Sequence, residues 1–363
     1  MDKRKVKISS VDDIYAHSCY FRTSTKAPYR KALLQITERC NLHCAHCFLS
    51  AEKEGQEMSF EEFKTKIFPF LEKAKVIGIT LTGGEPMLHP QIDKFIEFLA
   101  ENKIKTTICS NATLITLEQI SKYKNLGNVL FNVSLDGFSE ESHGKFRGDK
   151  KAFLITKKNL EYLAKAKLLK GLLVTPNNLA KKEEYSQICN FASELGIEYV
   201  LMNPLSSFGR GTNSAEKLEA NKNMMNEIRA DTSIYKNKID VVNVRFPNEE
   251  NKPLNSCEAG NILYIFSNGD ITVCPYLVFA SNNDISQYSP SDFIVGNLKK
   301  DTTDKCIRNL EKYDFSKLKE RKNEKCNQCC NASQCGQGCP ADVIARGKKL
   351  SDLDALCNKS RSR

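Results

Sequence analysis

Apolar and polar residues alternate along the first two thirds of the chain in the rhythm of strands and helices. Short apolar runs predict six buried strands, at 32–37, 76–84, 104–111, 128–137, 168–175 and 197–204. Helical periodicity between them predicts helices at 59–74, 91–102, 116–123, 150–166 and 182–195. Strands that alternate with helices favour a parallel sheet, which can close partly into a barrel. The expected fold class is therefore α/β.

The pattern changes in the last third of the chain. Residues 231–255 are polar and predict a linker. The run 262–276 predicts a β-hairpin, because it contains the Asn268-Gly269 pair that is typical of tight turns. A Lys-rich segment at 303–320 predicts a helix, and a cysteine-rich stretch follows it.

These changes divide the chain into four predicted units. They are an N-terminal extension (1–30), a partial barrel (31–230), a bridging segment (231–256) and a small cysteine-rich α+β domain (257–363). The extension of about thirty residues is too short for an independent domain.

The composition points to metal chemistry in a reducing compartment. The chain has 15 cysteines among 363 residues, and its first ten residues are charged rather than typical of a secretory signal. No apolar run is long enough to span a membrane. We therefore expect a cytoplasmic protein with no membrane association, whose clustered cysteines bind metal or act in catalysis. The net charge of +10 comes from scattered lysines, which favours a solvated surface over nucleic-acid binding.

Three cysteines follow the first predicted strand, with the spacing C-x3-C-x2-C at Cys40, Cys44 and Cys47. Ligand sites of parallel sheets gather at the carboxyl ends of the strands, where this loop lies. Thiolates at this position suit a zinc ion, redox chemistry or an iron–sulfur cluster. A zinc ion would need a fourth ligand such as His43 or His46, whereas three cysteines would leave one iron of a 4Fe–4S cluster free.

Further motifs follow at the ends of later strands. They are "GGEP" at 83–86, "SLDG" at 134–137 and "ESHGKFRG" at 141–148. Together with the three cysteines, they resemble the signatures of radical S-adenosylmethionine (SAM) enzymes. The resemblance implies a partial (β/α)6 barrel and a 4Fe–4S cluster on Cys40, Cys44 and Cys47, whose open iron binds SAM.

The same resemblance implies which residues contact SAM. They are His46, Gly83, Gly84, Glu85, Pro86, Ser110, Asn111, Ser134, Arg147 and Leu201. Gly83 and Gly84 would let the backbone approach the methionine part of SAM. Glu85 would accept from its ammonium group, and Arg147 would pair with its carboxylate.

The later cysteines resemble the SPASM domain that follows many radical SAM barrels. The resemblance implies two auxiliary clusters. One would be held by Cys326, Cys329, Cys335 and Cys357. The other would be held by Cys257, Cys274 and Cys339, one ligand short. In sulfatase-maturing relatives, an Asp that acts as the catalytic base follows the cysteine that matches Cys274. In this chain the residue at that position is Pro275, which cannot take a proton.

The resemblance implies reductive cleavage of SAM to a 5′-deoxyadenosyl radical, which abstracts hydrogen from a substrate. The favoured substrate is a ribosomally made precursor peptide, for crosslink formation or epimerisation. Side-chain modification of a tetrapyrrole is the first alternative, and a non-catalytic iron–sulfur electron carrier is the second. The expected partners are the peptide, a separate leader-binding protein, and a flavodoxin- or ferredoxin-type electron donor.

Overall fold

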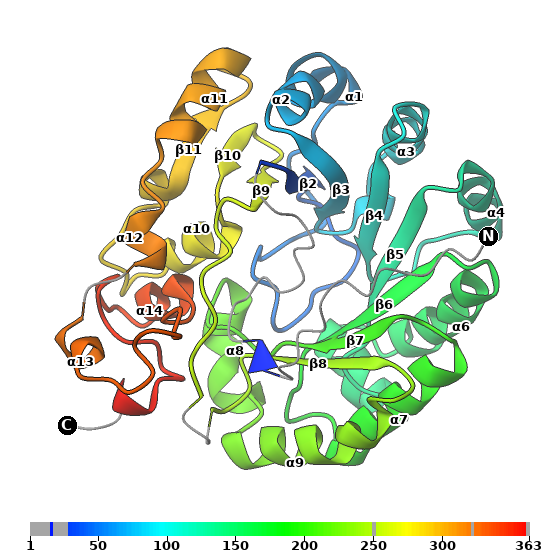
Figure 1. The fold of residues 1–363 in the computed structure, drawn as a ribbon. Helices are drawn as coiled ribbons and strands as arrows, with labels where there is room; N and C mark the ends of the chain where they lie inside the picture. Colours follow the sequence, from blue (N-terminus) through cyan, green and yellow to red (C-terminus); the bar gives the residue numbers. More distant parts are fainter. Residues whose placement is uncertain (1–14, 17–27, 249–251, 321–322, 361–363) are drawn as a thin grey trace, which may run out of the picture.

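The computed structural model describes residues 15–16, 28–248, 252–320 and 323–360 (Figure 1). Most of the predicted N-terminal extension lies outside these ranges.

A curved sheet forms the centre of the molecule, with parallel strands in chain order through most of its width (Figure 1). The six predicted strands are confirmed as β2 (Arg30–Thr37), β3 (Val76–Gly83), β4 (Lys105–Ser110), β5 (Val129–Ser134), β6 (Leu169–Val174) and β7 (Tyr199–Met202). Each pairs in parallel with its predecessor, so their carboxyl ends lie at one edge. The predicted α/β class and parallel sheet are confirmed.

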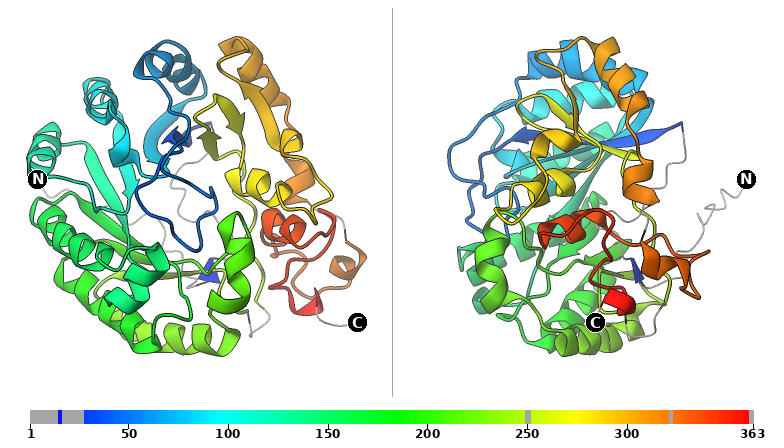
Figure 2. Two further views of the ribbon diagram at one scale, coloured as in Figure 1. Left: turned by 180° about the vertical axis from the view of Figure 1, so that it is seen from behind. Right: turned by 90° about the vertical axis from the view of Figure 1, so that its left-hand side faces the viewer.

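Helices cover the outer face of this sheet (Figure 2). The principal ones are α3 (Ile92–Glu101), α4 (Leu117–Leu126), α6 (Ala152–Lys165), α7 (Lys182–Glu194) and α9 (Lys222–Thr232). Shorter pieces are η2 (Pro86–Leu88), η3 (Glu140–Gly144), α5 (Lys145–Arg147), α8 (Arg210–Leu218) and η4 (Ser233–Tyr235).

The predicted helix at 59–74 is interrupted before Pro69. It consists of α1 (Phe60–Glu62), the π-helical η1 (Phe63–Ile67) and α2 (Phe68–Lys73). Proline lacks the N–H that an α-helix interior requires, and a wider π turn immediately before it accommodates that loss.

Strand alternation separates the outer core from the interior of the barrel. On β2, Ala32, Leu34 and Ile36 are fully buried in the core shared with the helices. Because successive side chains point to opposite faces, Leu33 and Gln35 face the interior. The interior-facing positions are the ones available to a ligand.

The predicted linker at 231–255 was wrong, because it contains strand β8 (Asp240–Val244). β8 pairs in parallel with β7, and its other edge pairs with the two-residue β1 (Tyr15–Ala16). The run Val241–Val242 is short and surrounded by polar residues, so its pattern was too weak to recognise, yet both side chains are buried.

The predicted hairpin is present as β9 (Ile262–Ile265) and β10 (Asp270–Thr272), but it ends earlier than expected. Helix α10 (Pro275–Ser281) begins directly after Cys274, because proline suits the first turn of a helix. β9 also pairs in parallel with β2, so the hairpin and β11 (Ile294–Asn297) extend the barrel sheet.

The remaining C-terminal elements follow one another along the left side of the molecule in Figure 1. They are η5 (Pro290–Phe293), α11 (Thr303–Lys312), α12 (Ser316–Lys319), α13 (Glu324–Asn327), α14 (Pro340–Ala345) and η6 (Asn358–Ser360). The predicted helix at 303–320 is thus two helices, separated at Tyr313.

A largely buried ion-pair network ties the cysteine-rich end to the barrel. Arg245, just after β8, donates from Nη1 and Nη2 to the two carboxylate oxygens of Asp354, at 2.9 and 3.1 Å. Its Nη2 lies 2.9 Å from Asp342 Oδ2. Asp354 Oδ2 also accepts from the Cys339 amide at 2.7 Å. One guanidinium therefore fixes two segments of the C-terminal region against the end of the sheet.

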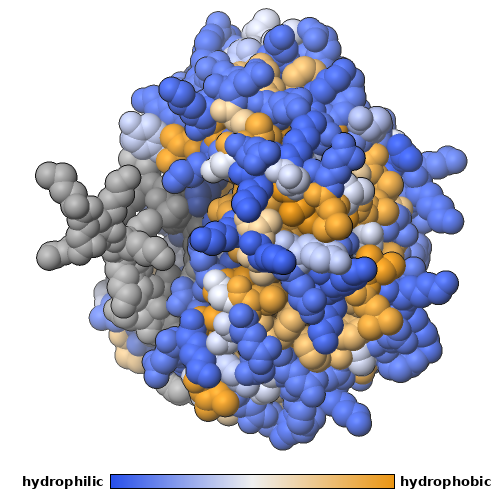
Figure 3. Space-filling model, turned by 90° about the vertical axis from the view of Figure 1, so that its right-hand side faces the viewer, coloured by the Kyte–Doolittle hydropathy of each residue, from blue (hydrophilic) through white to orange (hydrophobic). Residues whose placement is uncertain are grey.

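The outer surface is mostly hydrophilic. Figure 3 shows the side that lies at the right of Figure 1, where apolar side chains form small patches between charged and polar ones. Among the described residues, no helix combines the length and apolarity needed to cross a bilayer.

We predict that Arg245→Met lowers the free energy of unfolding by about 3–5 kcal/mol, because it leaves the carboxylate of Asp354 buried and unpaired. Chemical denaturation of the anaerobically purified protein measures this loss. Asp304→Asn is the matched control, because it removes only the exposed pair with Lys73. The control should keep the wild-type midpoint, and an equal effect of both substitutions would contradict the assignment.

Candidate active site

Cys40, Cys44 and Cys47 lie on one loop between β2 and α1. Cys40 and Cys44 are buried, and Cys47 is half-buried against the same small apolar cluster. The Cys40 amide donates to Glu52 O at 2.7 Å, which closes the loop upon itself. The structure therefore brings the three predicted ligands together at the carboxyl end of the sheet.

Each of the three sulfur atoms accepts one N–H group. Leu42 N lies 3.5 Å from Cys40 Sγ, and Ala51 N lies 3.4 Å from Cys47 Sγ. Arg147 Nη1 lies 3.7 Å from Cys44 Sγ. Such donors favour the thiolate form, although burial raises the pKa of Cys40 to about 12 and also raises the pKa of Cys44. Metal binding at this loop must therefore displace protons.

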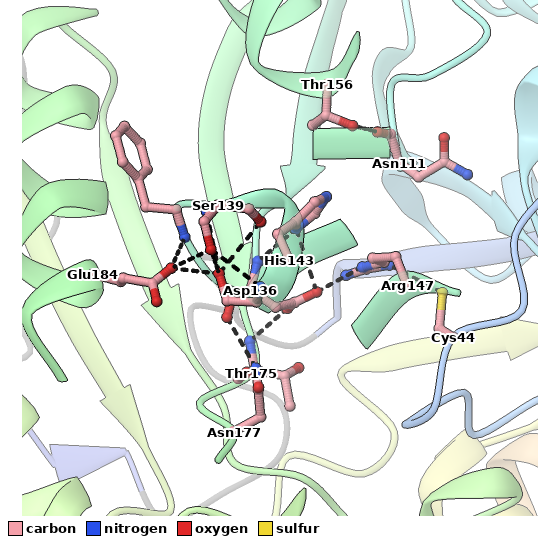
Figure 4. Close-up of polar contacts among 12 residues, drawn as sticks. Cys44, Asn111, Asp136, Ser139, His143, Arg147, Thr156, Thr175, Asn177 and Glu184 are labelled. Carbon is pink, nitrogen blue, oxygen red and sulfur yellow. Dashed lines mark hydrogen bonds and ion pairs between the residues drawn. The ribbon is translucent and has the colours of Figure 1, made fainter. Parts of the chain in front are cut away.

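Arg147 joins a buried polar network at the ends of β5 and β6 (Figure 4). Its Nε donates to Asp136 Oδ2 at 2.6 Å. Asp136 Oδ1 accepts from the Thr175 amide at 2.8 Å, and the Asp136 amide donates to His143 Nδ1 at 3.0 Å. The Asp136 carboxylate thus holds Arg147 in the orientation that reaches Cys44. The predicted contact between Arg147 and the carboxylate of SAM stays a prediction.

Burial and the Arg147 charge set the protonation states of this network. Burial opposes ionisation of Asp136, but the positive charge of Arg147 holds the pKa of that carboxyl below its usual range. Burial lowers the pKa of His143 to about 4 and that of His46 to about 3. Both imidazoles are therefore neutral at pH 7, consistent with His143 Nδ1 acting as an acceptor.

Glu85 connects the ends of β3 and β4. Its Oε1 accepts from Ser110 Oγ at 2.7 Å and from the Met87 amide at 3.1 Å, and its Oε2 accepts from the Asn111 amide at 2.8 Å. Burial raises the pKa of Glu85, whereas these hydrogen bonds act in the opposite direction. The side chain of Asn111 donates to Asn41 Oδ1 on the cysteine loop at 3.0 Å. Most acceptor positions of Glu85 are therefore used within the protein, and its predicted contact with SAM stays a prediction.

Gly83 and Gly84 let the end of β3 lie directly against the start of the cysteine loop. A Cβ atom on Gly83 would stand 2.4 Å from Thr37 O, and one on Gly84 would stand 2.3 Å from Arg39 O. Neither position therefore admits a side chain. Pro86 follows at the first turn of η2 and is buried.

The other predicted contact residues lie around the same edge. His46 stacks on Phe146, with ring centroids 4.5 Å apart, and its buried Nδ1 has no partner. Ser134 ends β5, and Leu201 packs on the buried valines of β8. Asn203, just beyond β7, has a buried Oδ1 with no hydrogen-bond partner. This acceptor is suited to an amino group such as that of adenine.

Sequence reasoning missed Arg210, which clamps the cysteine loop from α8. Its Nε donates to Cys44 O at 3.0 Å and its Nη1 donates to Ala51 O at 2.9 Å. Gly209 precedes it with φ +52°, and a Cβ there would lie 2.6 Å from Cys47 O. The glycine before an arginine, just past the last predicted strand, was the only sequence signal for this clamp.

The C-terminal cysteines form two groups. Cys326, Cys329, Cys335 and Cys357 line one small cavity, together with Leu254 and Asp354. Cys257, Cys274 and Cys339 are buried. Burial, followed by the charges of Cys257 and Cys339, raises the pKa of Cys274, which indicates that the three lie close together. The structure therefore places the first predicted set around one cavity, and the assignment of both sets as cluster ligands stays a prediction. Cys330 is exposed, whereas its neighbour Cys329 faces the cavity. Within the described ranges, no three His, Cys, Asp or Glu side chains are placed to bind one and the same metal ion, whereas the cysteines of a 4Fe–4S cluster each bind a different iron.

Comparison with known proteins identifies the domain that carries the three-cysteine loop. Residues 34–186 match the Radical SAM superfamily. The chain therefore contains a radical SAM domain over these residues. The match includes the cysteine loop, the glycine pair and Arg147, and it favours the iron–sulfur interpretation of the loop over zinc or redox thiols.

The chain shares sequence with curated proteins over part of their length. The antilisterial bacteriocin subtilosin biosynthesis protein AlbA of Bacillus subtilis (strain 168) is 30% identical over 187 residues, or 50% of this chain and 40% of AlbA. The AdoMet-dependent heme synthase of Methanosarcina barkeri (strain Fusaro / DSM 804) is 31% identical over 199 residues, or 53% of this chain and 55% of the synthase. The chain thus spans about half the length of these relatives.

Likeness of fold extends into the C-terminal region. Streptococcus suis SuiB, solved bound to S-adenosylmethionine, superposes with a TM-score of 0.68 and 18% identity, over 91% of this chain and 78% of SuiB. This coverage shows that the fold of SuiB, including its part that matches the C-terminal region of this chain, is shared.

The superfamily match supports a 4Fe–4S cluster and SAM as cofactors of the domain at 34–186. The residues present fit them. The cysteine loop offers three thiols, each with an N–H donor, and Asn203 and His46 offer buried nitrogen and oxygen atoms that lack partners.

We predict that His143→Asn weakens the pH dependence of stability on the acidic side. Between pH 6.5 and 4, the unfolded chain protonates His143 whereas the folded chain does not, so the free energy of unfolding falls as the pH is lowered. The contribution of neutral His143 to the free energy of unfolding is fully present above about pH 6.5. A single group of this kind changes that free energy by at most about 1.4 kcal/mol per pH unit. Urea denaturation of protein isolated without added iron should show a shallower slope for the variant. Identical slopes would contradict the neutral, buried state of His143.

We also predict that Arg210→Met reduces iron loading at the cysteine loop, because the loop carbonyls lose their clamp. The variant should retain roughly four iron atoms fewer per chain, the content of one cluster. Arg229→Met is the control, since Arg229 donates to Pro247 O, which does not belong to the cysteine loop. Iron analysis after anaerobic reconstitution measures the difference, and equal iron in both variants would refute the role of the clamp.

Proposed function

We propose that this protein reductively cleaves SAM and abstracts hydrogen from a ribosomally made precursor peptide, which leads to a crosslink or an inverted stereocentre. The observation that carries the proposal is the three-cysteine loop, held at the carboxyl end of a parallel sheet within the matched region 34–186. The loop provides three thiols. A 4Fe–4S cluster bound there would therefore have one iron without a protein ligand from this loop.

When bound, the cluster and SAM would supply an electron and a 5′-deoxyadenosyl radical, and the protein would position them. Asp136 orients Arg147 beside Cys44, where its charge would stabilise an anionic group. Glu85 fixes the ends of β3 and β4 relative to each other. His46, stacked on Phe146, would give the nucleoside a flat neutral surface.

The peptide substrate is supported by the relatives. SuiB has been solved bound to its precursor peptide SuiA, and that structure covers 91% of this chain with a TM-score of 0.67. AlbA is named for the biosynthesis of a bacteriocin. Pro275 is buried in the first turn of α10, so it offers no base of the kind expected for sulfatase maturation.

A tetrapyrrole substrate is the second candidate, supported by the 31% identity to a heme synthase. A non-catalytic electron carrier is disfavoured, because such a protein would not need the SAM motifs that the matched region contains.

The proposal includes two auxiliary clusters. Cys326, Cys329, Cys335 and Cys357 would hold one, and Cys257, Cys274 and Cys339 would hold the other. A low-potential flavodoxin or ferredoxin would supply electrons, and a separate protein would recognise the leader of the peptide.

The test is formation of 5′-deoxyadenosine from SAM and dithionite by the anaerobically reconstituted protein. Simultaneous replacement of Cys40, Cys44 and Cys47 by Ala should reduce this product at least a hundredfold. Iron should remain in the C-terminal region, because its cysteines are untouched. Cys306→Ala is the matched control, since Cys306 is buried beside Gly296 outside all three cysteine groups. A wild-type protein that forms no 5′-deoxyadenosine would overturn the proposal, and loss of all iron in the triple variant would overturn the separate auxiliary sites.

A further inference from the structure

Two buried polar side chains on the interior face of the barrel have polar atoms without partners. Gln35 on β2 and Tyr264 on β9 are each 2% exposed, and neither Gln35 Oε1 nor the Tyr264 hydroxyl has a hydrogen-bond partner. Polar atoms buried in this way are rare, because each loses its bonds to water. Such atoms in a native protein commonly await a ligand or a bound water.

The strand register places the two side chains next to each other. β2 and β9 are paired so that Leu33 stands opposite Tyr264, which makes Gln35 the diagonal neighbour of Tyr264 on the same face. Leu263 and Ile265, on either side of Tyr264, are buried in the outer core with the helices. Alternation along the strand therefore turns Tyr264 inward, as it does Gln35.

A cavity of about 250 Å³ lies in front of Gln35. It is lined by Gln35 and Phe266 from the two strands and by Leu49, Ser50 and Ala51 from the cysteine loop. The ring of Phe266 lies 4.8 Å from that of Tyr264. Gln35 therefore faces the cavity beside the cysteine loop, and Tyr264 packs against Phe266, which also lines it.

The donor and acceptor pattern of the pair matches a peptide bond. The Tyr264 hydroxyl can donate to a carbonyl oxygen, and the Gln35 carbonyl can accept from an amide N–H. Glu38 and Glu54 also line the cavity, and their negative charges would repel the carboxylates of a tetrapyrrole. Those carboxylates would also offer no N–H group to Gln35. The cavity is smaller than the 300–1,000 Å³ common for small-molecule sites, which suits a threaded chain segment.

We propose that Gln35 and Tyr264 are positioning residues that bind the main chain of the substrate peptide beside the cysteine loop. This inference rests on the proposed peptide-modifying function and names the protein groups that would hold the peptide there. Because they bind main-chain atoms, the contact is independent of the peptide's side chains.

The test uses holoprotein with SAM and a pool of random heptapeptides that are N-acetylated and C-amidated. Peptides retained after rapid anaerobic gel filtration are quantified by mass spectrometry. Gln35→Leu and Tyr264→Phe should each lower retention about tenfold, and by a similar factor for all retained sequences, because each removes one hydrogen bond to a shared group. Tyr235→Phe, in η4 outside the barrel interior, is the matched control and should retain peptides as the wild type does.

A second pool, with ester links in place of the amides, separates binding from a structural effect. Esters lack the N–H group, so Gln35→Leu should change retention of this pool less than twofold. An equal loss for both pools would overturn the assignment of Gln35. Retention by Tyr264→Phe equal to that of the wild type would overturn the assignment of Tyr264.

The same samples distinguish this inference from the function on which it rests. If the wild type forms no 5′-deoxyadenosine, the proposed function itself fails. If it forms the product but both variants retain peptides normally, only the inference fails. Retention of coproporphyrin III and of no peptide by the wild type would overturn the inference and favour the tetrapyrrole candidate.

Discussion

The structure depends on one constraint: a short loop must hold three thiols at the carboxyl end of a parallel sheet. A loop of this kind has few contacts of its own, so its shape is imposed by its neighbours. Arg210 binds its carbonyl groups, Gly84 lets β3 approach its first residues, and Arg147 reaches Cys44 from the end of β5. Each support comes from a different part of the chain, and therefore the loop is ordered only when the barrel is folded.

The C-terminal region is joined to this barrel by strand pairing and by charge. β9 continues the sheet beyond β2, and Arg245 fixes Asp354 and Asp342 against the end of β8. These connections set the cysteine-rich groups at a defined place relative to the cysteine loop. The aromatic side chains Phe48, Tyr276 and Phe279 pack at the junction, with centroids of Phe48 and Phe279 5.0 Å apart. The peptide-binding pair that we infer lies at the same junction, since Tyr264 is on β9.

The local sequence pattern was sufficient to predict much of the fold and many residues of the candidate site. The six strands have strong apolar runs, and the cysteines, the glycine pair and Arg147 stand at recognisable spacings. β8 was missed because its apolar core is only a few residues long, and the pairing of β9 with β2 joins segments about 230 residues apart that share no local signal. The role of Arg210 likewise depends on contacts over more than 150 residues. The network of Glu85, Ser110 and Asn111 could not be foreseen, because the sequence identifies residues at strand ends but not which of them bond to one another.

The central claim is that the iron left without a protein ligand on the cysteine loop binds SAM. Electron paramagnetic resonance of the dithionite-reduced protein, recorded before and after addition of SAM, tests this most directly. We expect SAM to change the spectrum of one cluster in the wild type, and to change nothing in the variant in which Cys40, Cys44 and Cys47 are replaced by Ala. A wild-type spectrum that does not respond to SAM, or an equal response in the variant, would contradict the account.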